Sequence, residues 1–133
     1  MTVLPIQTPS APAVAGPYSP AVRAGDWIVL AGQVPLDPAT GGLVEGDAAA
    51  QCLQVLANIA GVLADCGASF ADVAKTTVFV TDLADFAAMN DVYAQAFGEH
   101  KPARSTVQVA ALPLGAKVEI ETWAYLPTAG SGR

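Results

Sequence analysis

The chain has 133 residues, of which 53% are hydrophobic and only 14% are charged, and its formal net charge is −6. A chain of this length is long enough for one domain, which can bury a core without a disulfide or a metal ion to hold it together. The six basic residues are scattered, which argues against nucleic acid as a partner because nucleic-acid-binding proteins usually carry a basic face.

The two ends of the chain differ in composition from its middle. We expect a single domain over residues 1–133, in which residues 1–12 form an extended arm because prolines recur there among small residues. Residues 128–133 are rich in glycine and serine and are expected to form a flexible tail. No apolar stretch is expected to reach the roughly 18 residues of a membrane span, so no membrane contact is predicted.

A β-hairpin is predicted first. Residues 19–24 have the pattern of a short strand, and Gly25-Asp26 is a two-residue turn sequence. Residues 27–33 follow as a mostly apolar strand, which is typical of a strand covered on both faces. The sequence of residues 37–42, Asp-Pro-Ala-Thr-Gly-Gly, then predicts a turn.

A long amphipathic helix comes next, with Asp47 as its N-cap and Gly67 as its terminator. Its apolar positions recur every three or four residues and predict one buried stripe, made of Cys52, Val55, Leu56, Ile59, Val62, Leu63 and Cys66. The two cysteines are 14 positions apart, about 21 Å along a helix, so they cannot form a disulfide with each other. Free thiols and the lack of a secretory leader indicate a cytoplasmic protein.

The second half of the chain repeats the alternation of strand and helix. Residues 72–80 alternate with period two and are rich in β-branched side chains, which predicts a strand. A second helix is expected after a cap at Thr81 or Asp82 and ends at Gly98. Two strands close the chain, over residues 103–109 and 117–126.

The order β-β-α-β-α-β-β predicts an α+β fold, a mixed β-sheet with two helices packed on one face. Strands linked by long helices favour parallel pairing, whereas the opening hairpin is antiparallel. The opposite face of such a sheet is left open, and the high apolar content favours its burial against a neighbouring subunit of a homo-oligomer.

Arg104 stands out because it is one of few cations and lies inside a strand that alternates. Alternation puts Arg104 on one face with Thr106, and it gives the last strand a polar face with Glu119 and Glu121. We expect these two polar faces to coincide. Burying a guanidinium without a partner is costly, so Arg104 forms either a salt bridge with one of these glutamates or a two-pronged contact with a ligand carboxylate.

Other chemistries find little support. His100 is the only histidine and is expected at the surface, and no cluster of histidine and cysteine indicates a metal site. The chain has no nucleophile elbow of the type Gly-x-Ser-x-Gly and no glycine-rich phosphate loop. Neither a metal nor another cofactor is therefore expected.

Several separate motifs match one family pattern in the right order. They are Gly16-Pro17-Tyr18-Ser19, residues 32–38 (Gly-Gln-Val-Pro-Leu-Asp-Pro), residues 75–80 (Lys-Thr-Thr-Val-Phe-Val), Pro102-Ala103-Arg104-Ser105, Ala110-Ala111-Leu112-Pro113 and Val118-Glu119-Ile120-Glu121. Through these motifs the chain resembles the reactive intermediate deaminase A (RidA, YjgF) family from about residue 13 to residue 125.

The resemblance implies a chorismate-mutase-like fold assembled as a homotrimer, with the three sheets forming a central barrel and ligand clefts between adjacent subunits. It also implies an activity without a cofactor, the hydrolysis of reactive enamines and imines such as 2-aminoacrylate and 2-iminobutanoate to 2-keto acids and ammonia. The expected partner is thus a small imino or enamino acid.

Individual roles follow from the same resemblance. Arg104 matches the arginine that binds the substrate carboxylate, and Glu119 matches the residue thought to position the attacking water. Tyr18 matches an aromatic hydroxyl that lines the cleft. Gly32 matches a backbone donor beside the ligand, and Asn90 matches an asparagine near the cleft.

Two positions depart from the deaminase branch of the family. Ala31 stands where a serine often precedes the glycine, and Thr106 stands where a cysteine often follows the arginine by two residues. The loss of the hydroxyl at Ala31 leaves open a non-catalytic module that binds a small carboxylate or keto acid and regulates a partner. A ribonuclease, the third alternative, fits the acidic charge poorly.

Overall fold

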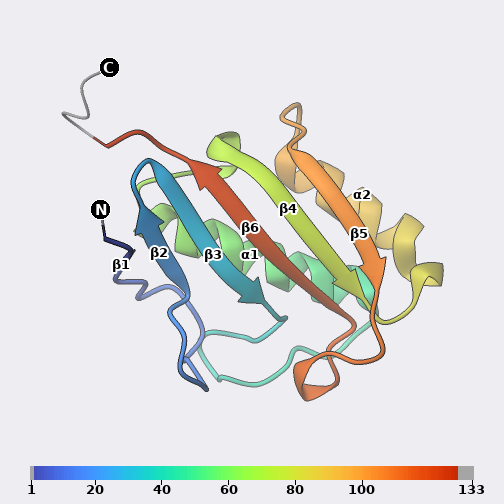
Figure 1. Ribbon diagram of the computed structural model, residues 1–133. Coiled ribbons are helices and arrows are strands. Elements are labelled where there is room, and N and C mark those ends of the chain that lie inside the picture. Colours follow the sequence, from blue (N-terminus) through green and yellow to red (C-terminus); the bar gives the residue numbers. More distant parts are fainter. Residues whose placement is uncertain (1, 129–133) are drawn as a thin grey trace.

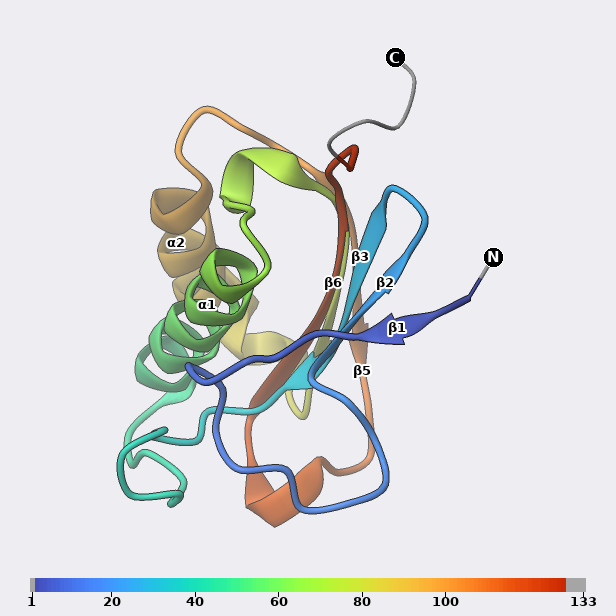
Figure 2. The same cartoon turned by 90° about the vertical axis from the view of Figure 1, so that its left-hand side faces the viewer.

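A computed structural model describes residues 2–128 and shows a mixed sheet with two helices on one face, which confirms the predicted α+β fold (Figures 1 and 2). Six strands are ordered β1-β2-β3-β6-β4-β5. Their bounds are β1 Leu4–Pro5, β2 Ala21–Ala24, β3 Trp27–Gln33, β4 Val73–Val80, β5 Ala103–Gln108 and β6 Val118–Tyr125. The helices are α1, Ala48–Asp65, and α2, Phe86–Phe97. The expected C-terminal tail lies outside the described residues except for Thr128.

Helix α1 begins and ends where the sequence predicts. The side chain of Asp47 accepts a hydrogen bond of 2.9 Å from the backbone N–H of Ala50, and Gly67 adopts the left-handed conformation with φ 79°. By length and composition α1 could cross a membrane, with 18 residues of mean hydropathy 1.3, so the expectation that no stretch reaches this length is wrong. Half of the helix is buried within the fold, however, and its apolar stripe faces the sheet as a core helix does.

Helix α2 starts later than predicted. The carboxylate of Asp82 accepts a hydrogen bond of 2.9 Å from the backbone N–H of Ala84 and caps a short 3-10 turn, Leu83–Asp85, before α2 begins. Gly98, with φ 62°, follows its last residue as predicted. Met89, Tyr93 and Phe97 are buried along one side of α2. This spacing presents an aromatic side of the helix to the sheet.

The sheet combines antiparallel and parallel pairs of strands. β2 and β3 form the predicted antiparallel hairpin, and β4 pairs with β5 in parallel, with α2 as the connection. β6 lies between β3 and β4 and is antiparallel to both. The expected parallel pairing therefore holds only for β4 and β5, because β6 separates the two strands that α1 connects.

The N-terminal segment is attached to the fold at two places that the sequence did not reveal. β1 pairs with β2 at the edge of the sheet, with Leu4 opposite Arg23. Farther along, the backbone N–H and the hydroxyl of Ser10 donate to the carboxylate of Asp65, at 2.9 and 2.8 Å. The segment thus crosses from the sheet to the end of α1 before it returns to β2.

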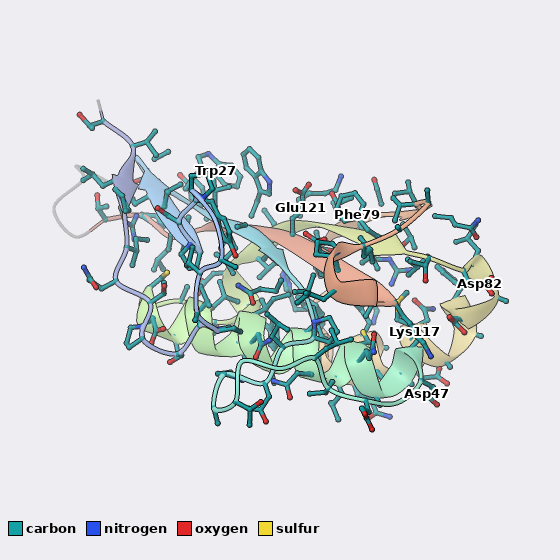
Figure 3. The ribbon with its side chains drawn as sticks, turned by 90° about the horizontal axis from the view of Figure 1, so that it is seen from below. Trp27, Asp47, Phe79, Asp82, Lys117 and Glu121 are labelled. Atoms are coloured by element: carbon teal, nitrogen blue, oxygen red, sulfur yellow. The ribbon has the colours of Figure 1, made fainter. Side chains whose placement is uncertain are left out.

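The face of the sheet away from the helices carries large exposed side chains. Trp27 packs edge-on against Trp123 and Tyr125, with ring centroids 6.1 and 5.2 Å apart, yet these three side chains are between 38% and 44% exposed. Figure 3 shows Trp27, Glu121 and Phe79 on this side of the sheet, away from the helices. An aromatic cluster of this size on an open face is typical of a surface that meets another protein chain.

Candidate active site

Arg104 points toward the helices. In the register of the sheet, Arg104 pairs with Thr76, which in turn pairs with Thr122, and both threonines are fully buried beneath the helices. Residues paired in this way share a face of the sheet. The expectation that Arg104 shares a face with Glu119 or Glu121 is therefore wrong. These glutamates lie on the open face, and β4 separates their strand from β5.

Helix α2 supplies the surroundings of the guanidinium. Nη1 of Arg104 donates a hydrogen bond of 2.7 Å to the side-chain oxygen of Asn90. Its Cζ atom lies 4.8 Å from the ring centroid of Tyr93 and 5.4 Å from that of Phe86. Within residues 2–128, these contacts are with an amide and two rings, and no carboxylate pairs with the guanidinium. Arg104 thus has hydrogen-bonding capacity left for an anion.

The aromatic platform under Arg104 was not predicted, although the sequence holds a signal for it. Phe86, Asn90 and Tyr93 are spaced at i, i+4 and i+7, which places them on one face of α2. The Tyr93 hydroxyl lies 2.6 Å from the hydroxyl of Thr76, so the ring is fixed in place. Burial raises the pKa of Tyr93, which keeps its hydroxyl protonated at neutral pH.

A pocket of about 370 Å³ opens beside this arginine and holds three basic side chains, those of Arg104, Lys101 and His100. His100 is half-buried, with Nε2 2.7 Å from the carbonyl oxygen of Val73. The prediction that His100 lies at the surface is only partly right, because the loop after α2 folds back onto the start of β4 and half-buries this residue. Two of the six lysine and arginine residues of this acidic chain, Lys101 and Arg104, thus line one pocket.

Two further side chains lie on the helix side of this region. Thr106 follows Arg104 on the same face of β5, and its hydroxyl oxygen is buried without a hydrogen-bond partner in the described part of the chain. The donor capacity of this hydroxyl is therefore unused within the described residues. Cys52 is buried in the core, and burial raises the pKa of its thiol to about 12, so it is not a nucleophile.

A second pocket, of about 470 Å³, contains the other predicted site residues. Tyr18, Ala31, Gly32 and Glu119 all line it. A β-bulge shifts the register between Leu30 and Gln33, so that Ala31 and Gly32 lie opposite the part of β6 between Ile120 and Thr122. Tyr18 is 53% exposed and comes from the N-terminal segment.

Glu119 lies directly over Gly32. A Cβ atom at position 32 would lie only 2.0 Å from Oε2 of Glu119, so only glycine leaves room for the carboxylate in this position. Burial raises the pKa of Glu119 above its ordinary value, and the neighbouring charge of Glu121 raises it further. A carboxylate of this kind is a better proton acceptor near neutral pH than an exposed glutamate.

The predicted site residues thus fall into two groups. Arg104, Asn90 and Thr106 lie on the helix side of β5, whereas Tyr18, Ala31, Gly32 and Glu119 line the pocket at the end of β3. One chain cannot bring both groups onto one small ligand, because the sheet lies between them. Among residues 2–128 there is no group of three or more histidine, cysteine or acidic side chains placed to hold a metal ion.

Comparison with known proteins identifies the family to which the chain belongs. The family described as Endoribonuclease L-PSP matches residues 8–126. A RutC family protein from Pyrococcus horikoshii is 51% identical over 120 residues, which cover 90% of this chain and 95% of that protein. The 2-iminobutanoate/2-iminopropanoate deaminase of Capra hircus is 48% identical over 116 residues, covering 87% of this chain and 85% of that enzyme.

Solved structures agree with the sequence relatives. The crystal structure of Escherichia coli TdcF with bound serine superposes with a TM-score of 0.86 and 43% identity, covering 91% of this chain and 97% of that one. The chain belongs to the Endoribonuclease L-PSP family, which includes the RidA proteins. The resemblance found in the sequence motifs is confirmed.

Proposed function

We propose that this protein hydrolyses reactive 2-imino and enamino acids, of the 2-iminobutanoate and 2-aminoacrylate type, to 2-keto acids and ammonia. The observation that carries the proposal is the state of Arg104. It is held by Asn90 and two aromatic rings, it has no ion-pair partner among residues 2–128, and it faces a pocket. Relatives that are 48% identical are named 2-iminobutanoate/2-iminopropanoate deaminases, which supports the same reaction.

We further propose that the site is completed between copies of the chain in a homotrimer. A ligand held by Arg104 of one copy would meet Glu119 and Tyr18 of the next, which resolves the separation of the two groups within one chain. The exposed cluster of Trp27, Trp123 and Tyr125 supports this assembly, because a neighbouring sheet would remove it from water.

The reaction requires that the imine and a water molecule be positioned correctly more than it requires a strong acid or base. Arg104 binds the carboxylate of the protonated imine, and Glu119 accepts a proton from a water molecule that attacks the iminium carbon. The resulting carbinolamine receives that proton on nitrogen from Glu119. The C–N bond then breaks to release ammonia, and the hydroxyl gives its proton to the carboxylate of Glu119 to form the keto acid. An enamine first becomes the imine by taking a proton on carbon and losing one from nitrogen.

A binding module without turnover is the second candidate, and Ala31 is the observation that favours it. Ala31 lines the pocket without the side-chain hydroxyl of a serine, and its backbone N–H already donates to the carbonyl oxygen of Pro20, so neither its side chain nor its N–H can donate a hydrogen bond to the ligand. In that case the site would bind a 2-keto acid and report it to a partner. The net charge of −6 continues to disfavour a ribonuclease.

A cytoplasmic location is part of the proposal, together with a small molecule rather than nucleic acid or a membrane as the partner. Both cysteines are free thiols, which supports a reducing compartment. The relative from Arabidopsis thaliana is named chloroplastic, so location varies among the relatives.

The test is to add the purified protein to a threonine dehydratase reaction and follow 2-oxobutanoate. Faster keto-acid appearance that is lost in Arg104→Ala, with the assembly intact by light scattering, supports the deaminase. Tight binding of 2-oxobutanoate without any acceleration supports the binding module instead. A crystal structure with 2-oxobutanoate is expected to show its carboxylate on Arg104 at a subunit boundary.

A further inference from the structure

Leu114 combines two unfavourable properties. Its φ of 61° makes it the one non-glycine residue with positive φ among residues 2–128, and the next residue, Gly115, also has a positive φ of 75°. A leucine in the left-handed conformation is strained, because its Cβ atom approaches its own backbone. The Leu114 side chain is also 69% exposed, the largest value among the exposed large hydrophobic residues. Packing within the chain does not explain a leucine here, and backbone strain of this kind often marks a functional position.

The strained leucine borders the pocket that holds Glu119. Leu114 lines this pocket, and Pro113 before it lines it as well. The loop after β3 contributes Val34 and Leu36, and the N-terminal segment contributes two small residues, Ala13 and Ala15. Polar side chains in the pocket are limited to Tyr18 and Glu119, and no cation is among the residues that line it. The remaining wall is apolar.

We propose that Leu114 is a specificity-determining residue that contacts the side chain of the substrate, so that the protein prefers 2-imino acids with longer aliphatic side chains over the three-carbon imine. This inference rests on the proposed function. The reactive carbon of the substrate carries three substituents: a carboxylate, a nitrogen and a side chain. The carboxylate is assigned to Arg104, and the nitrogen is assigned to Glu119 together with the attacking water. The side chain is the substituent that remains, and the apolar wall is the surface that remains for it.

The pocket's volume and chemistry fit this substrate class. The pocket measures about 470 Å³ in one chain, which leaves room for a substrate side chain longer than a methyl group. Each buried methylene of a substrate improves discrimination by roughly 10-fold or more in a hydrophobic pocket. An acidic substrate side chain would lie near Glu119, no cation of the same chain lines this pocket, and Arg104 of the next copy is already assigned to the substrate carboxylate, which together disfavour imines derived from aspartate or glutamate.

The experiment compares imines made in situ by an L-amino-acid oxidase from alanine, leucine and glutamate, with semicarbazide competing for the imine. The wild-type protein is expected to show a kcat/KM at least 10-fold higher for the leucine-derived imine than for the other two. Leu114→Ala is expected to lower that value about 10-fold and to change the value for the alanine-derived imine less than twofold. Leu114→Met, which restores an apolar side chain of similar volume, is expected to retain the preference.

Two results would overturn the proposal. One is an equal change of kcat/KM for all substrates in Leu114→Ala. The other is dissociation of that variant in light scattering, which would make Leu114 an assembly residue. Leu114→Asn is a second variant that guards against misfolding, because asparagine tolerates the left-handed conformation; it is expected to lose the preference while its Tm stays at or above the wild-type value.

A binding measurement separates this inference from the proposed function. Calorimetry with pyruvate and 4-methyl-2-oxopentanoate needs no turnover, and the longer keto acid is expected to bind at least 10-fold more tightly, with that advantage lost in Leu114→Ala. If no imine is hydrolysed but this preference persists, the deaminase proposal fails and the role of Leu114 stands. If imines are hydrolysed without any preference for chain length, the deaminase proposal stands and the role of Leu114 fails.

Discussion

The side-chain oxygen of Asn90 accepts a hydrogen bond of 2.7 Å from Nη1 of Arg104, and this pair joins the middle of α2 to the edge strand β5. The amide accepts one hydrogen bond from the guanidinium without neutralising its positive charge. Because the rings of Phe86 and Tyr93 also lie near the guanidinium, its position is set while its charge stays available. A binding site for a carboxylate needs this combination, a cation that is fixed before the ligand arrives.

Asn90→Asp tests whether the neutrality of this partner matters. An aspartate at position 90 would place a carboxylate on Arg104 and compete with the carboxylate of the substrate. We expect KM to rise at least about 10-fold, because a carboxylate this close to Arg104 weakens binding of the substrate carboxylate by roughly 1.4 kcal/mol or more. The Tm is not expected to fall. Steady-state kinetics and thermal unfolding check both. A KM unchanged from the wild type would mean that Arg104 does not bind the substrate.

Arg104→Ala removes the anion-binding group itself. We expect kcat/KM to fall about 100-fold or more, because a charge-assisted hydrogen-bonded pair is lost to the substrate. Lys101→Ala is the matched control, since Lys101 is an exposed cation that lines the same pocket. It is expected to lower kcat/KM by less than threefold, through long-range attraction alone. Equal losses in the two variants would indicate a diffuse charge effect instead of a specific contact.

Gly32→Ala tests the close approach of Glu119 to the backbone of β3. The added methyl group would collide with the Glu119 carboxylate, which is the end of a flexible side chain and can move away with little change in stability. A displacement of about 1 Å at a reacting group can lower the rate roughly 100-fold, so we expect kcat to fall by about that factor. Gly42→Ala is the control, because its new Cβ atom would have only an ordinary contact with Thr40. Loss of folding in Gly32→Ala alone would contradict the prediction.

Apart from β1, the strands and helices of this fold could be read from local patterns, but the faces of the edge strand β5 could not. Asp47 and Gly67 mark the ends of α1 through cap chemistry that involves only neighbouring residues. In β5, by contrast, Val107 is 43% exposed on the open face while Arg104 lies beneath α2. An edge strand buries neither face fully, so its alternation does not reveal which side meets the helices.

The candidate site shows the same division between local and long-range information. Arg104 and Glu119 were found from motifs, yet their placement on opposite faces of the sheet depends on the register in which β4 pairs with β5 and β6. The contact with Asn90 and the strained backbone of Leu114 also arise from tertiary packing. Sequence patterns of single strands do not encode these relationships.

Tyr93→Phe separates the ring of Tyr93 from its hydroxyl. The variant keeps the ring beside Arg104 but leaves the fully buried Thr76 without its hydrogen-bond partner at 2.6 Å. We expect the free energy of unfolding to fall by about 1–2 kcal/mol in urea titrations at fixed protein concentration, with kcat/KM changed less than threefold. Adding Thr76→Val should recover most of the lost stability, because both polar groups are then replaced. A large loss of activity in Tyr93→Phe would assign the hydroxyl a part in the chemistry.

Glu119→Gln tests two effects of the Glu119 carboxyl, its part in the reaction and its influence on the pH dependence of stability. Without a proton acceptor, kcat is expected to fall about 100-fold or more. Burial and Glu121 raise the pKa of Glu119 in the folded protein above its ordinary value of 4.5. Ionisation of this carboxyl therefore opposes folding, and the wild type loses this part of its stability as the pH rises from 4.5 through the folded-state pKa. Glutamine does not titrate, so Glu119→Gln should match the wild type below pH 4.5 and exceed its Tm at neutral pH.

The pH dependence of the wild-type rate provides the second half of this test. Because Glu119 must be ionised to accept a proton, kcat/KM should rise with pH through a pKa above 4.5. Glu121→Gln removes the neighbouring charge and should move this rise to lower pH. Glu45→Gln, a change at an exposed glutamate, is the control and should leave the profile in place. A profile that does not move in Glu121→Gln would show that the titrating group is not Glu119.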